Sequence, residues 1–288
     1  MEITFIGTGG GRFNLIDQLR RTGGFYISGS LRLHIDPGPG ALVACKEFGI
    51  DATKTNVVVA THNHIDHMND AGLMLEAINC FPDRKRGIIV SSKSVLVGDE
   101  YNERGISSYF INKLSRTEVA RQGKPIKLGK ATLTPTPVRH EDATGFGFVL
   151  SMDGCRIGYT SDTEYFPALS QHFRGCDILI ANDLKPKRNS IGGHLYSATT
   201  ARLARECSPR LCVLNHMGRS LIKSGPDREA KKIEMQSEVR TIAASDGMRI
   251  NLPSHGSPII RDTLGFRAAG SKTRQHSVLA LPSLKVKK

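Results

Sequence analysis

Three histidines and one aspartate lie within a stretch of six residues, at His62, His64, Asp66 and His67. The apolar run directly before them, residues 56–60, is short and rich in valine, so it predicts a buried strand that delivers these side chains to a loop. Residues two apart in an extended segment point the same way, so His62 and His64 can bind one metal ion. The pattern turns helical from residue 68, which places Asp66 and His67 at the turn into a helix, where they can face a second ion. The alternative interpretation is a histidine-rich polar turn without a ligand role.

Three later predicted strands also end near a side chain that can bind a metal ion, namely His140, Asp162 and His216. Each alone is a weak indication, since a single histidine in a loop is more often structural. Side chains from the ends of several strands can meet at one edge of a sheet system, and with the first cluster they provide seven ligands. Seven ligands suffice for two ions that share one bridging carboxylate. Imidazole nitrogen and carboxylate oxygen suit zinc, with manganese or iron as alternatives.

The elements that must position these residues are short strands and a few helices. The predicted strands cover residues 1–6, 25–28, 31–35, 56–60, 87–91, 125–128, 131–134, 146–150, 156–160, 177–181 and 210–214, and the predicted helices cover 41–48, 68–78 and 197–207. Periodicity alone indicates an α/β or α+β protein with many strands. No proline- or serine-rich linker divides the chain, so we expect one domain over residues 1–265 and a basic C-terminal tail over residues 266–288. The tail is either solvated or in contact with nucleic acid.

The composition is that of an ordinary globular protein, with 39% hydrophobic and 23% charged residues among 288. No apolar run approaches the roughly twenty residues that a membrane span requires, and the N-terminus lacks the basic segment and cleavage site of a signal peptide. We therefore expect a cytoplasmic protein that does not bind membranes. Six scattered cysteines without a C-x-x-C pair then predict buried free thiols rather than disulfides or a cysteine metal site. The net charge of +13 favours anionic partners, phosphates included.

Several other polar positions allow two interpretations. The glycine-rich loop 7–11 lacks the spacing of a dinucleotide-binding loop and is not a P-loop, so we interpret it as a tight turn that lets backbone approach the site. Arg20 and Arg21 could clamp a phosphate or be solvated. Asp36, just beyond a predicted strand, could accept a hydrogen bond from a metal-binding histidine or cap the helix 41–48.

Together these positions resemble the metallo-β-lactamase superfamily, over most of residues 1–255. The resemblance implies a four-layer αβ/βα sandwich, in which two mixed sheets lie face to face with helices outside. The ligands that it implies are His62, His64 and His140 for one metal, Asp66, His67 and His216 for the second, and Asp162 as the bridge. An aspartate at the bridging position is typical of a branch that includes tRNA 3′-processing endonucleases, the cyclic phosphodiesterase of phosphonate breakdown and other phosphodiesterases.

His194 and the helix after it resemble an additional histidine motif of those phosphodiesterases, in which the histidine contacts the scissile phosphate and helps to protonate the leaving oxygen. The alternative is a histidine at a helix entry without a catalytic part. One departure concerns the tRNA-processing enzymes of the bacterial type, which carry a long glycine-rich arm between the third histidine motif and the bridging aspartate. Here His140 and Asp162 are one hairpin apart, so the arm is absent at this position, which argues against pre-tRNA processing but leaves phosphodiesterase chemistry intact.

These features predict a phosphodiesterase with two divalent metal ions, acting on RNA or on small cyclic or nucleotide phosphodiesters. A hydroxide bridging the ions would attack the phosphate, with Asp66 and His194 as the catalytic residues. Arg20, Arg21 and Arg139 would attract the substrate. A homodimer is compatible with the sequence.

Three other functions compete with this one. Hydrolysis of lactones, thioesters or other carboxylic substrates would use the same metals, but would need neither His194 nor the positive charge. A redox di-iron protein is disfavoured by His64, because that branch usually replaces one histidine of the motif by glutamate. A non-catalytic binding protein is disfavoured by the complete ligand set.

Overall fold

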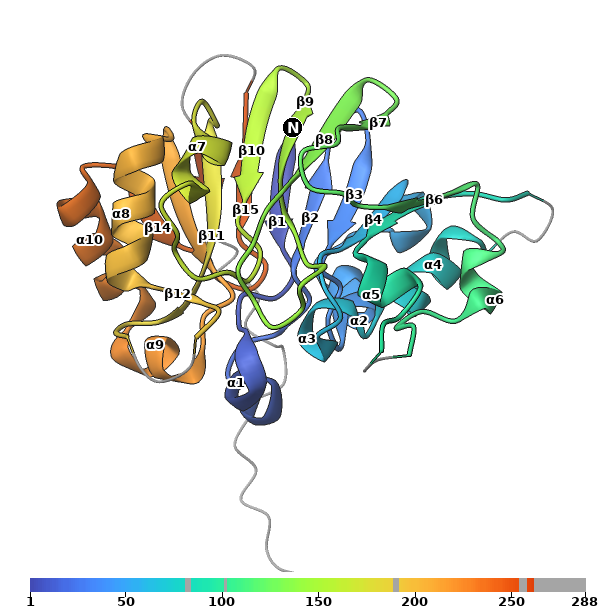
Figure 1. Ribbon diagram of the computed structural model, residues 1–288, viewed down its shortest axis with the longest axis horizontal. Helices are drawn as coiled ribbons and strands as arrows, with labels where there is room; N and C mark the ends of the chain where they lie inside the picture. The colour runs from blue at the N-terminus through green and yellow to red at the C-terminus, as the bar shows by residue number, and fades with distance from the viewer. Residues whose placement is uncertain (81–83, 101–102, 189–191, 254–257, 262–288) are drawn as a thin grey trace, which may run out of the picture.

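Two large β-sheets lie face to face, with helices on both outer sides (Figure 1). The computed structural model describes residues 1–80, 84–100, 103–188, 192–253 and 258–261. Within these ranges the chain forms the four-layer αβ/βα sandwich that was expected. The predicted basic tail, residues 266–288, lies outside the described residues.

Each sheet has a strand order that brings distant parts of the sequence together. The first sheet has the order β16 (Ile259–Arg261), β15 (Arg249–Asn251), β1 (Glu2–Phe5), β2 (Phe25–Ser28), β3 (Arg32–Ile35), β4 (Val57–Ala60), β5 (Ile88–Ser91) and β6 (Arg116–Val119). The second has the order β14 (Thr241–Ala243), β13 (Leu211–Asn215), β11 (Ile178–Lys185), β10 (Cys155–Tyr159), β9 (Gly147–Met152), β8 (Ala131–Thr136) and β7 (Ile126–Leu128), and β12 (Leu195–Tyr196) pairs with β11.

Strand β4 shows why the central strands are apolar without interruption. Val57 and Val59 point into the core between the two sheets, whereas Val58 and Ala60 point into a second core beneath the helices. Side chains alternate between the faces of a strand, so a strand covered on both faces favours apolar residues at successive positions. Strands β11 and β13 divide their side chains between two cores in the same way.

Helices cover the outer face of each sheet (Figure 1). On the side of the first sheet lie α2 (Ala41–Glu47), the short 3₁₀ helix η1 (Ala52–Lys54), α3 (Ile65–Met68), α4 (Ala71–Ile78), α5 (Lys93–Leu96) and α6 (Ser108–Ile111), and on the side of the second lie α7 (Leu169–Phe173), α8 (Ser197–Cys207), α9 (Arg219–Ser224) and α10 (Pro226–Ser237). Helix α1 (Gly11–Asp17) stands at one end of the molecule, between the two groups. No helix in the described ranges has the length and apolar character needed to cross a membrane.

The direction of the strands gathers the predicted ligands at one edge. Strands β3 to β6 run parallel to one another, as do β10, β11, β13 and β14. The carboxyl ends of parallel strands lie at the same edge of a sheet. The chain leaves β4 toward His62, β10 toward Asp162 and β13 toward His216, and all three residues lie near the end of the molecule that carries α1.

The predicted elements correspond to observed ones, with a few corrections. Strands β8, β9 and β11 extend beyond their predicted ends. Asp66 and His67 lie inside α3, a single helical turn, rather than ahead of the helix. The six cysteines are free thiols as predicted, and all except Cys80 are buried. Strands β6, β12, β14, β15 and β16 and helices α1, α5, α6, α7, α9 and α10 were not anticipated.

Asp183 is a fully buried carboxyl group in β11, next to the first turn of α8. Its Oδ2 accepts a hydrogen bond of 3.3 Å from Ser197 Oγ. Burial raises the pKa of Asp183 to about 8, and nearby Glu229 acts in the same direction. The group is therefore protonated in the folded chain at neutral pH, whereas it is ionised in the unfolded chain.

The pH dependence of stability follows from this difference. Between the unfolded pKa of about 4 and the folded pKa of about 8, folding takes up a proton, so the contribution of Asp183 to stability falls as pH rises. Replacing Asp183 by Asn removes this dependence. We expect the Tm of Asp183→Asn, relative to the unsubstituted protein, to rise by at least about 2 °C between pH 5 and pH 8, which corresponds to roughly 1 kcal/mol. A relative Tm that stays constant, or falls, over this range would show that Asp183 is ionised in the folded protein.

Candidate metal centre

The seven predicted ligands converge at the sheet edge in two groups. One group contains His62, His64, His140 and Asp162, and the other contains Asp66, His67 and His216; in each group, one ligand atom per residue lies within 4.8 Å of all the others. The folded chain therefore brings together every side chain that was named as a ligand. Either group could hold a metal ion.

The first group is built around His64. Its Nδ1 lies 3.1 Å from His62 Nε2 and 3.1 Å from His140 Nε2. Asp162 Oδ2 lies 4.0 Å from His62 Nε2 and 4.0 Å from His140 Nε2. His140 Nδ1 lies 2.9 Å from the carbonyl oxygen of Gly193. A carbonyl oxygen only accepts hydrogen bonds, so Nδ1 carries the proton and Nε2 presents its lone pair to the group.

The second group joins helix α3 to the end of β13. His67 Nε2 lies 2.9 Å from His216 Nε2, which in turn lies 3.2 Å from Asp66 Oδ2. His67 Nε2 is also 3.4 Å from Asp162 Oδ2. The Asp162 carboxylate, a member of the first group, thus also lies next to the second.

The spacing and chemistry of these donors fit divalent metal ions. A tetrahedral site with Zn–N bonds of about 2.0–2.1 Å separates its donor atoms by roughly 3.3 Å. The separations observed between neighbouring donors run from 2.9 Å to 4.0 Å. Two imidazole nitrogens that face each other can share only one proton. Where several nitrogens point at one position, some lone pairs therefore have no proton to accept, and a metal cation at that position can bind them. Neutral imidazole and carboxylate are donors that zinc, manganese and iron accept.

The electrostatics of the centre also favour a cation. Asp162 is only 2% exposed. Burial alone raises the pKa of Asp162, but the imidazoles of His216 and His67 outweigh burial and hold that pKa well below its usual value. Burial alone lowers the pKa of His67, but the carboxylates of Asp162 and Asp66 outweigh burial and raise that pKa well above its usual value. The carboxylates are therefore ionised, and a positive charge among them is stabilised.

Asp36 supports the centre from beneath. Its Oδ2 accepts hydrogen bonds from His67 Nδ1 (2.9 Å), from the Tyr159 hydroxyl (2.7 Å) and from Thr61 Oγ1 (2.9 Å), and its Oδ1 accepts one from the Thr61 N–H (2.8 Å). Helix α2 begins after Gly40 and has no side-chain cap. Of the two interpretations of Asp36, the structure therefore shows the hydrogen-bond acceptor for His67 and not the helix cap. The bond to Nδ1 directs His67 Nε2 toward the other ligands.

Three residues around the centre have a backbone conformation that is unusual for residues other than glycine. The φ angles of Asp36, Ser161 and His216 are 50°, 53° and 52°. A left-handed conformation costs such residues on the order of 1 kcal/mol or more, and it persists where the surroundings determine it. Each of the three lies within two residues of the end of a strand. The left-handed turn there directs the side chain of that residue, or of the next one, into the centre.

The glycine-rich loop approaches the centre closely. A Cβ atom on Gly10 would lie 2.2 Å from the His216 ring, and the N–H of Gly10 donates to the carbonyl oxygen of Met217 at 3.1 Å. The N–H of Gly11 donates to Asp66 Oδ2 at 2.8 Å. Only glycine fits at position 10, and the interpretation of this loop as a close approach of backbone is confirmed.

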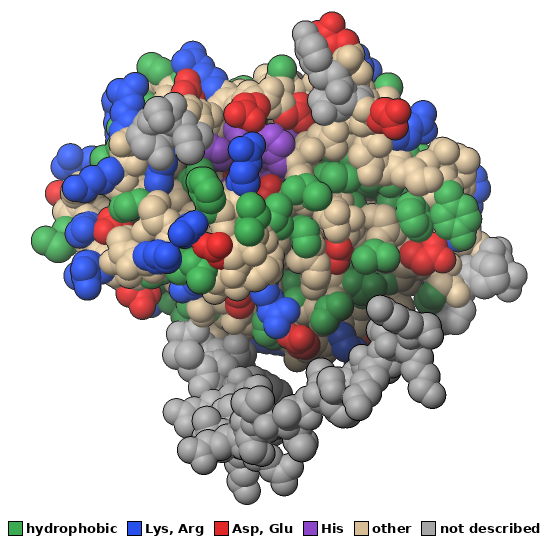
Figure 2. Space-filling view, turned by 90° about the horizontal axis from the view of Figure 1, so that it is seen from below, with side chains coloured by type: hydrophobic (Ala, Val, Ile, Leu, Met, Phe, Trp, Pro, Cys, Tyr) green, Lys and Arg blue, Asp and Glu red, His purple; other side chains and the backbone are tan. Residues whose placement is uncertain are grey.

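A pocket of about 830 Å³ opens beside the ligands. Asp66, Asp162, His64 and His194 form one side, and the other side is formed by α1, α9 and the end of β11. The basic residues of the lining are Arg12, Lys185, Arg219 and Lys223. Figure 2 views this end of the molecule and shows histidine side chains at the surface, with a basic side chain beside them and hydrophobic side chains nearby.

His194 lies inside the pocket next to the ligands, as its predicted catalytic role requires. Its side chain is 12% exposed, and its Nδ1 lies 3.5 Å from Asp162 Oδ2. Nδ1 has no hydrogen-bond partner among the described residues. Burial lowers the pKa of His194 to about 4, so the imidazole is neutral at neutral pH.

The three arginines predicted to bind substrate are not brought to the pocket. Arg20 Nη1 donates to the Ala244 carbonyl oxygen at 2.6 Å, and Arg21 Nη2 donates to Glu47 Oε2 at 2.7 Å. The Arg139 guanidinium lies over the Phe166 ring, 4.9 Å from its centroid. Each charge is thus engaged elsewhere, and none of the three is among the lining residues of the described pocket.

Two further residues that position the centre were not found from the sequence. Asn182 Nδ2 donates to Asp162 Oδ1 at 2.7 Å. Asp142 accepts the N–H of Asn63, between two ligand histidines, at 3.0 Å, and the N–H of Thr144 at 2.8 Å. Asn182 lies at the end of a predicted strand, which is the same signal that identified the ligands. Asp142 carries no such signal, because partners such as Asn63 and Ser94 are distant in sequence and meet it only on folding.

Comparisons with known proteins agree with this architecture. The beta-lactamase superfamily domain matches residues 31–217. An uncharacterized protein of Methanocaldococcus jannaschii is 39% identical over 255 residues, which cover 88% of this chain and 95% of the relative. Ribonuclease Z of Pyrobaculum aerophilum is 22% identical over 227 residues, which cover 65% of this chain and 76% of the relative.

Solved structures show the same fold. The metallo-beta-lactamase fold protein YhfI from Bacillus subtilis superimposes with a TM-score of 0.70 and 19% identity, covering 86% of this chain and 97% of YhfI. A diphosphatase from the PhnP family superimposes with a TM-score of 0.64 and 18% identity, covering 88% and 98%. The domain match spans more than half of the chain, and the chain therefore belongs to the beta-lactamase superfamily, as a metal-dependent hydrolase of the metallo-β-lactamase fold.

Proposed function

We propose that this hydrolase is a phosphodiesterase with two divalent metal ions, which cleaves RNA or small cyclic or nucleotide phosphodiesters. The observation that carries the proposal is the position of His194, whose side chain lines the pocket and whose Nδ1 lies 3.5 Å from the central Asp162 carboxylate. An imidazole beside the ligands can hydrogen-bond a phosphate oxygen and protonate a leaving alkoxide. A relative named ribonuclease Z and a structural neighbour named a diphosphatase support the choice of phosphate chemistry.

The metal ions would be held by the two groups and their shared carboxylate. The ligands would be His62, His64 and His140 for one ion and Asp66, His67 and His216 for the other, with Asp162 between them. Bound zinc ions would supply Lewis acidity and lower the pKa of a coordinated water. Manganese or iron would suit the same nitrogen and oxygen donors.

The remaining roles belong to side chains of the pocket. Asp66 is held at the pocket wall by the N–H of Gly11 (2.8 Å), where its carboxylate can orient the attacking water. His194 is neutral in the free site because burial lowers its pKa to about 4. An anionic phosphate in contact with the ring favours the protonated imidazole, which then passes its proton to the leaving oxygen.

Basic side chains of the pocket favour an anionic substrate, since two of the three carboxylates in the lining, Asp66 and Asp162, are proposed metal ligands and the third is Glu141. Four basic side chains line the pocket, namely Arg12, Lys185, Arg219 and Lys223. Cationic walls raise the local concentration of anions and position phosphate groups. A neutral lactone or thioester would gain nothing from them. We therefore place hydrolysis of carboxylic substrates second.

A substrate panel separates these two functions. The protein loaded with zinc or manganese would be assayed with bis-p-nitrophenyl phosphate, a 2′,3′-cyclic nucleotide and an RNA oligonucleotide, alongside lactones and thioesters. We expect kcat/KM to be highest for one of the phosphodiesters. Turnover of lactones or thioesters alone would overturn the proposal.

Removal of the shared carboxylate tests the binuclear arrangement. We expect Asp162→Ala to abolish hydrolysis and to reduce bound metal from two ions per chain to about one, because the carboxylate contributes to both groups. Metal analysis of the dialysed protein measures the content. An Asp162→Ala variant that retains two ions and its activity would contradict the assignment.

Removal of His194 tests the acid role separately from metal binding. We expect His194→Ala to keep its full metal content and to lower kcat by about 10²–10⁴, the usual contribution of a general acid. His172→Ala, which removes a histidine of α7, serves as the control and should behave as the unsubstituted protein. Loss of metal in His194→Ala would identify His194 as a ligand instead.

Replacement of Asp36 tests whether its hydrogen bond to His67 contributes to metal affinity. Asn tolerates the positive φ of this position but lacks the negative charge, so we expect Asp36→Asn to weaken metal affinity about 10–100-fold. Asp153 is the matched control, since it also has a positive φ, of 51°, and accepts a backbone hydrogen bond from Ser30. Chelator competition would compare Asp36→Asn with Asp153→Asn, and equal affinities would show that the Asp36 carboxylate does not support the centre.

A further inference from the structure

The outer wall of the pocket combines an exposed aromatic ring with basic side chains. Phe13 of α1 lines the pocket with 57% of its surface exposed. Among the described residues that line the pocket, it is the one with an aromatic ring apart from His64 and His194. A phenylalanine exposed to this extent in the lining of a pocket leaves ring surface available for a bound group.

The ring is held in place by the neighbouring helix. The Arg219 guanidinium of α9 lies over it, 5.7 Å from the centroid, and Arg219 Nε is 3.1 Å from Asp17 Oδ2 at the other end of α1. These contacts tie α1 to α9 across the wall. Phe13 is therefore positioned before a ligand arrives, which reduces the entropy lost on binding.

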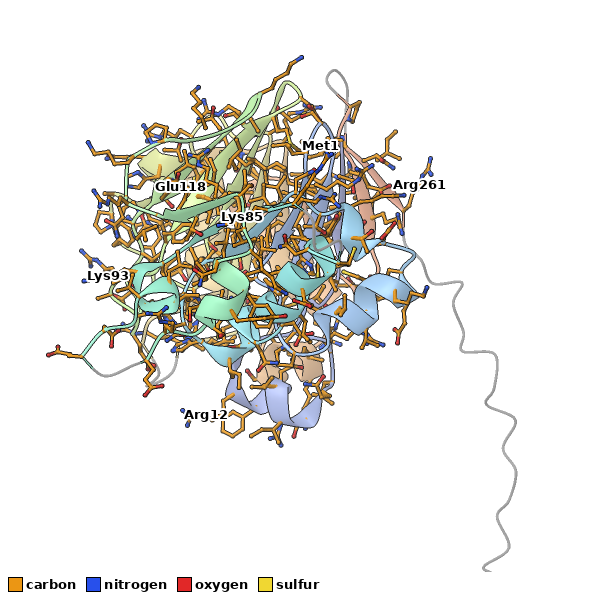
Figure 3. All side chains as sticks on the ribbon, turned by 90° about the vertical axis from the view of Figure 1, so that its right-hand side faces the viewer. Met1, Arg12, Lys85, Lys93, Glu118 and Arg261 are labelled. Atoms are coloured by element: carbon orange, nitrogen blue, oxygen red, sulfur yellow. The ribbon has the colours of Figure 1, made fainter. Side chains whose placement is uncertain are left out.

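Two cations next to the ring remain available to an anion. Arg12 and Lys223 line the same wall and are exposed, and neither forms an ion pair with any residue that the structure describes. Arg12 projects from the end of the molecule formed by α1, as the label in Figure 3 shows. A flat apolar ring flanked by basic side chains is the combination that binds nucleotides, with the base stacked and the backbone phosphates contacted by the cations.

We propose that this wall is a nucleoside subsite, in which Phe13 stacks on the base attached to the scissile phosphate and Arg12 and Lys223 contact a neighbouring phosphate. The inference rests on the proposed phosphodiesterase function and narrows its substrates to those that carry a nucleobase. An acyl chain would leave the cations without a counterion, and a base-free diester would leave the ring uncovered. Specificity thus comes from α1 and α9, while the chemistry comes from the ligand side of the pocket.

Two substrates with one leaving group test the subsite. Thymidine 5′-(p-nitrophenyl phosphate) carries a base, methyl p-nitrophenyl phosphate does not, and both release p-nitrophenolate. We expect Phe13→Ala to lower kcat/KM for the thymidine diester about tenfold, within the range that a stacked base contributes, and to leave the methyl diester within twofold. Phe13→Trp should retain the preference for the thymidine diester.

Ile16 provides the matched control on the same helix. It is 72% exposed but does not line the pocket, so Ile16→Ala should leave both substrates unchanged. Equal losses on both substrates in Phe13→Ala, or equal effects of Phe13→Ala and Ile16→Ala, would overturn the subsite. A change of oligomeric state in Phe13→Ala, measured by light scattering, would do so as well, because the ring would then belong to a contact between copies.

A binding measurement separates this proposal from the proposed function. Calorimetric titration with AMP should show binding that is weakened about tenfold in Phe13→Ala and unchanged in Ile16→Ala. If the unsubstituted enzyme hydrolyses neither diester but binds AMP in this way, the subsite stands and the phosphodiesterase function fails. If both diesters are hydrolysed and Phe13 has no effect on turnover or AMP binding, the function stands and the subsite fails.

Discussion

The buried carboxylate of Asp162 is the interaction on which the architecture of the site depends. An ionised carboxylate that is 2% exposed is unfavourable unless it is paired and hydrogen-bonded. Here Asn182 donates to one oxygen at 2.7 Å, and nitrogens of His67 and His194 lie within 3.5 Å of the other. These partners come from three separate segments, so the charge is balanced only when both sheets are assembled. The same carboxylate lies beside both groups of side chains that could hold a metal ion.

The backbone provides the geometry that this balance requires. The two sheets bring the ends of β4, β10 and β13 to one edge. Left-handed turns at Asp36, Ser161 and His216 direct the side chains of Asp36, Asp162 and His216 toward the centre. The unfavourable conformation at Asp36 is offset by four hydrogen bonds to its carboxylate. At Gly10 the absence of a side chain lets the first loop contact the His216 ring. The rigid sheets and the strained turns thus together set the geometry of the site.

The sequence predicted the chemistry of the ligand side better than that of the opposite wall. The cluster from His62 to His67 has a local signature, and the strands that carry the other ligands have uninterrupted apolar runs because both of their faces are buried. Strand β6 was missed because it lies at the edge of its sheet and its residues Arg116–Val119 are partly exposed and largely polar. Arg20 and Arg21 were misplaced because the position of a long charged side chain depends on partners distant in sequence, such as Ala244.

Phe13 is a second residue whose position could not be predicted from the sequence. Its sequence context, a short polar helix after a glycine-rich loop, gives no indication that the ring faces a pocket. Its exposure and its contact with Arg219 arise only when α1 and α9 meet. The recognition wall is therefore assembled from residues that carry no motif, whereas the ligand side is assembled from residues that carry a strong one.

Anomalous scattering from crystals grown with zinc tests the central claim most directly. Data collected on either side of the zinc absorption edge should show two peaks, one among His62, His64 and His140 and the other among Asp66, His67 and His216, both adjacent to Asp162. A single peak outside these groups, or no peak at a zinc concentration that supports hydrolysis, would contradict the account.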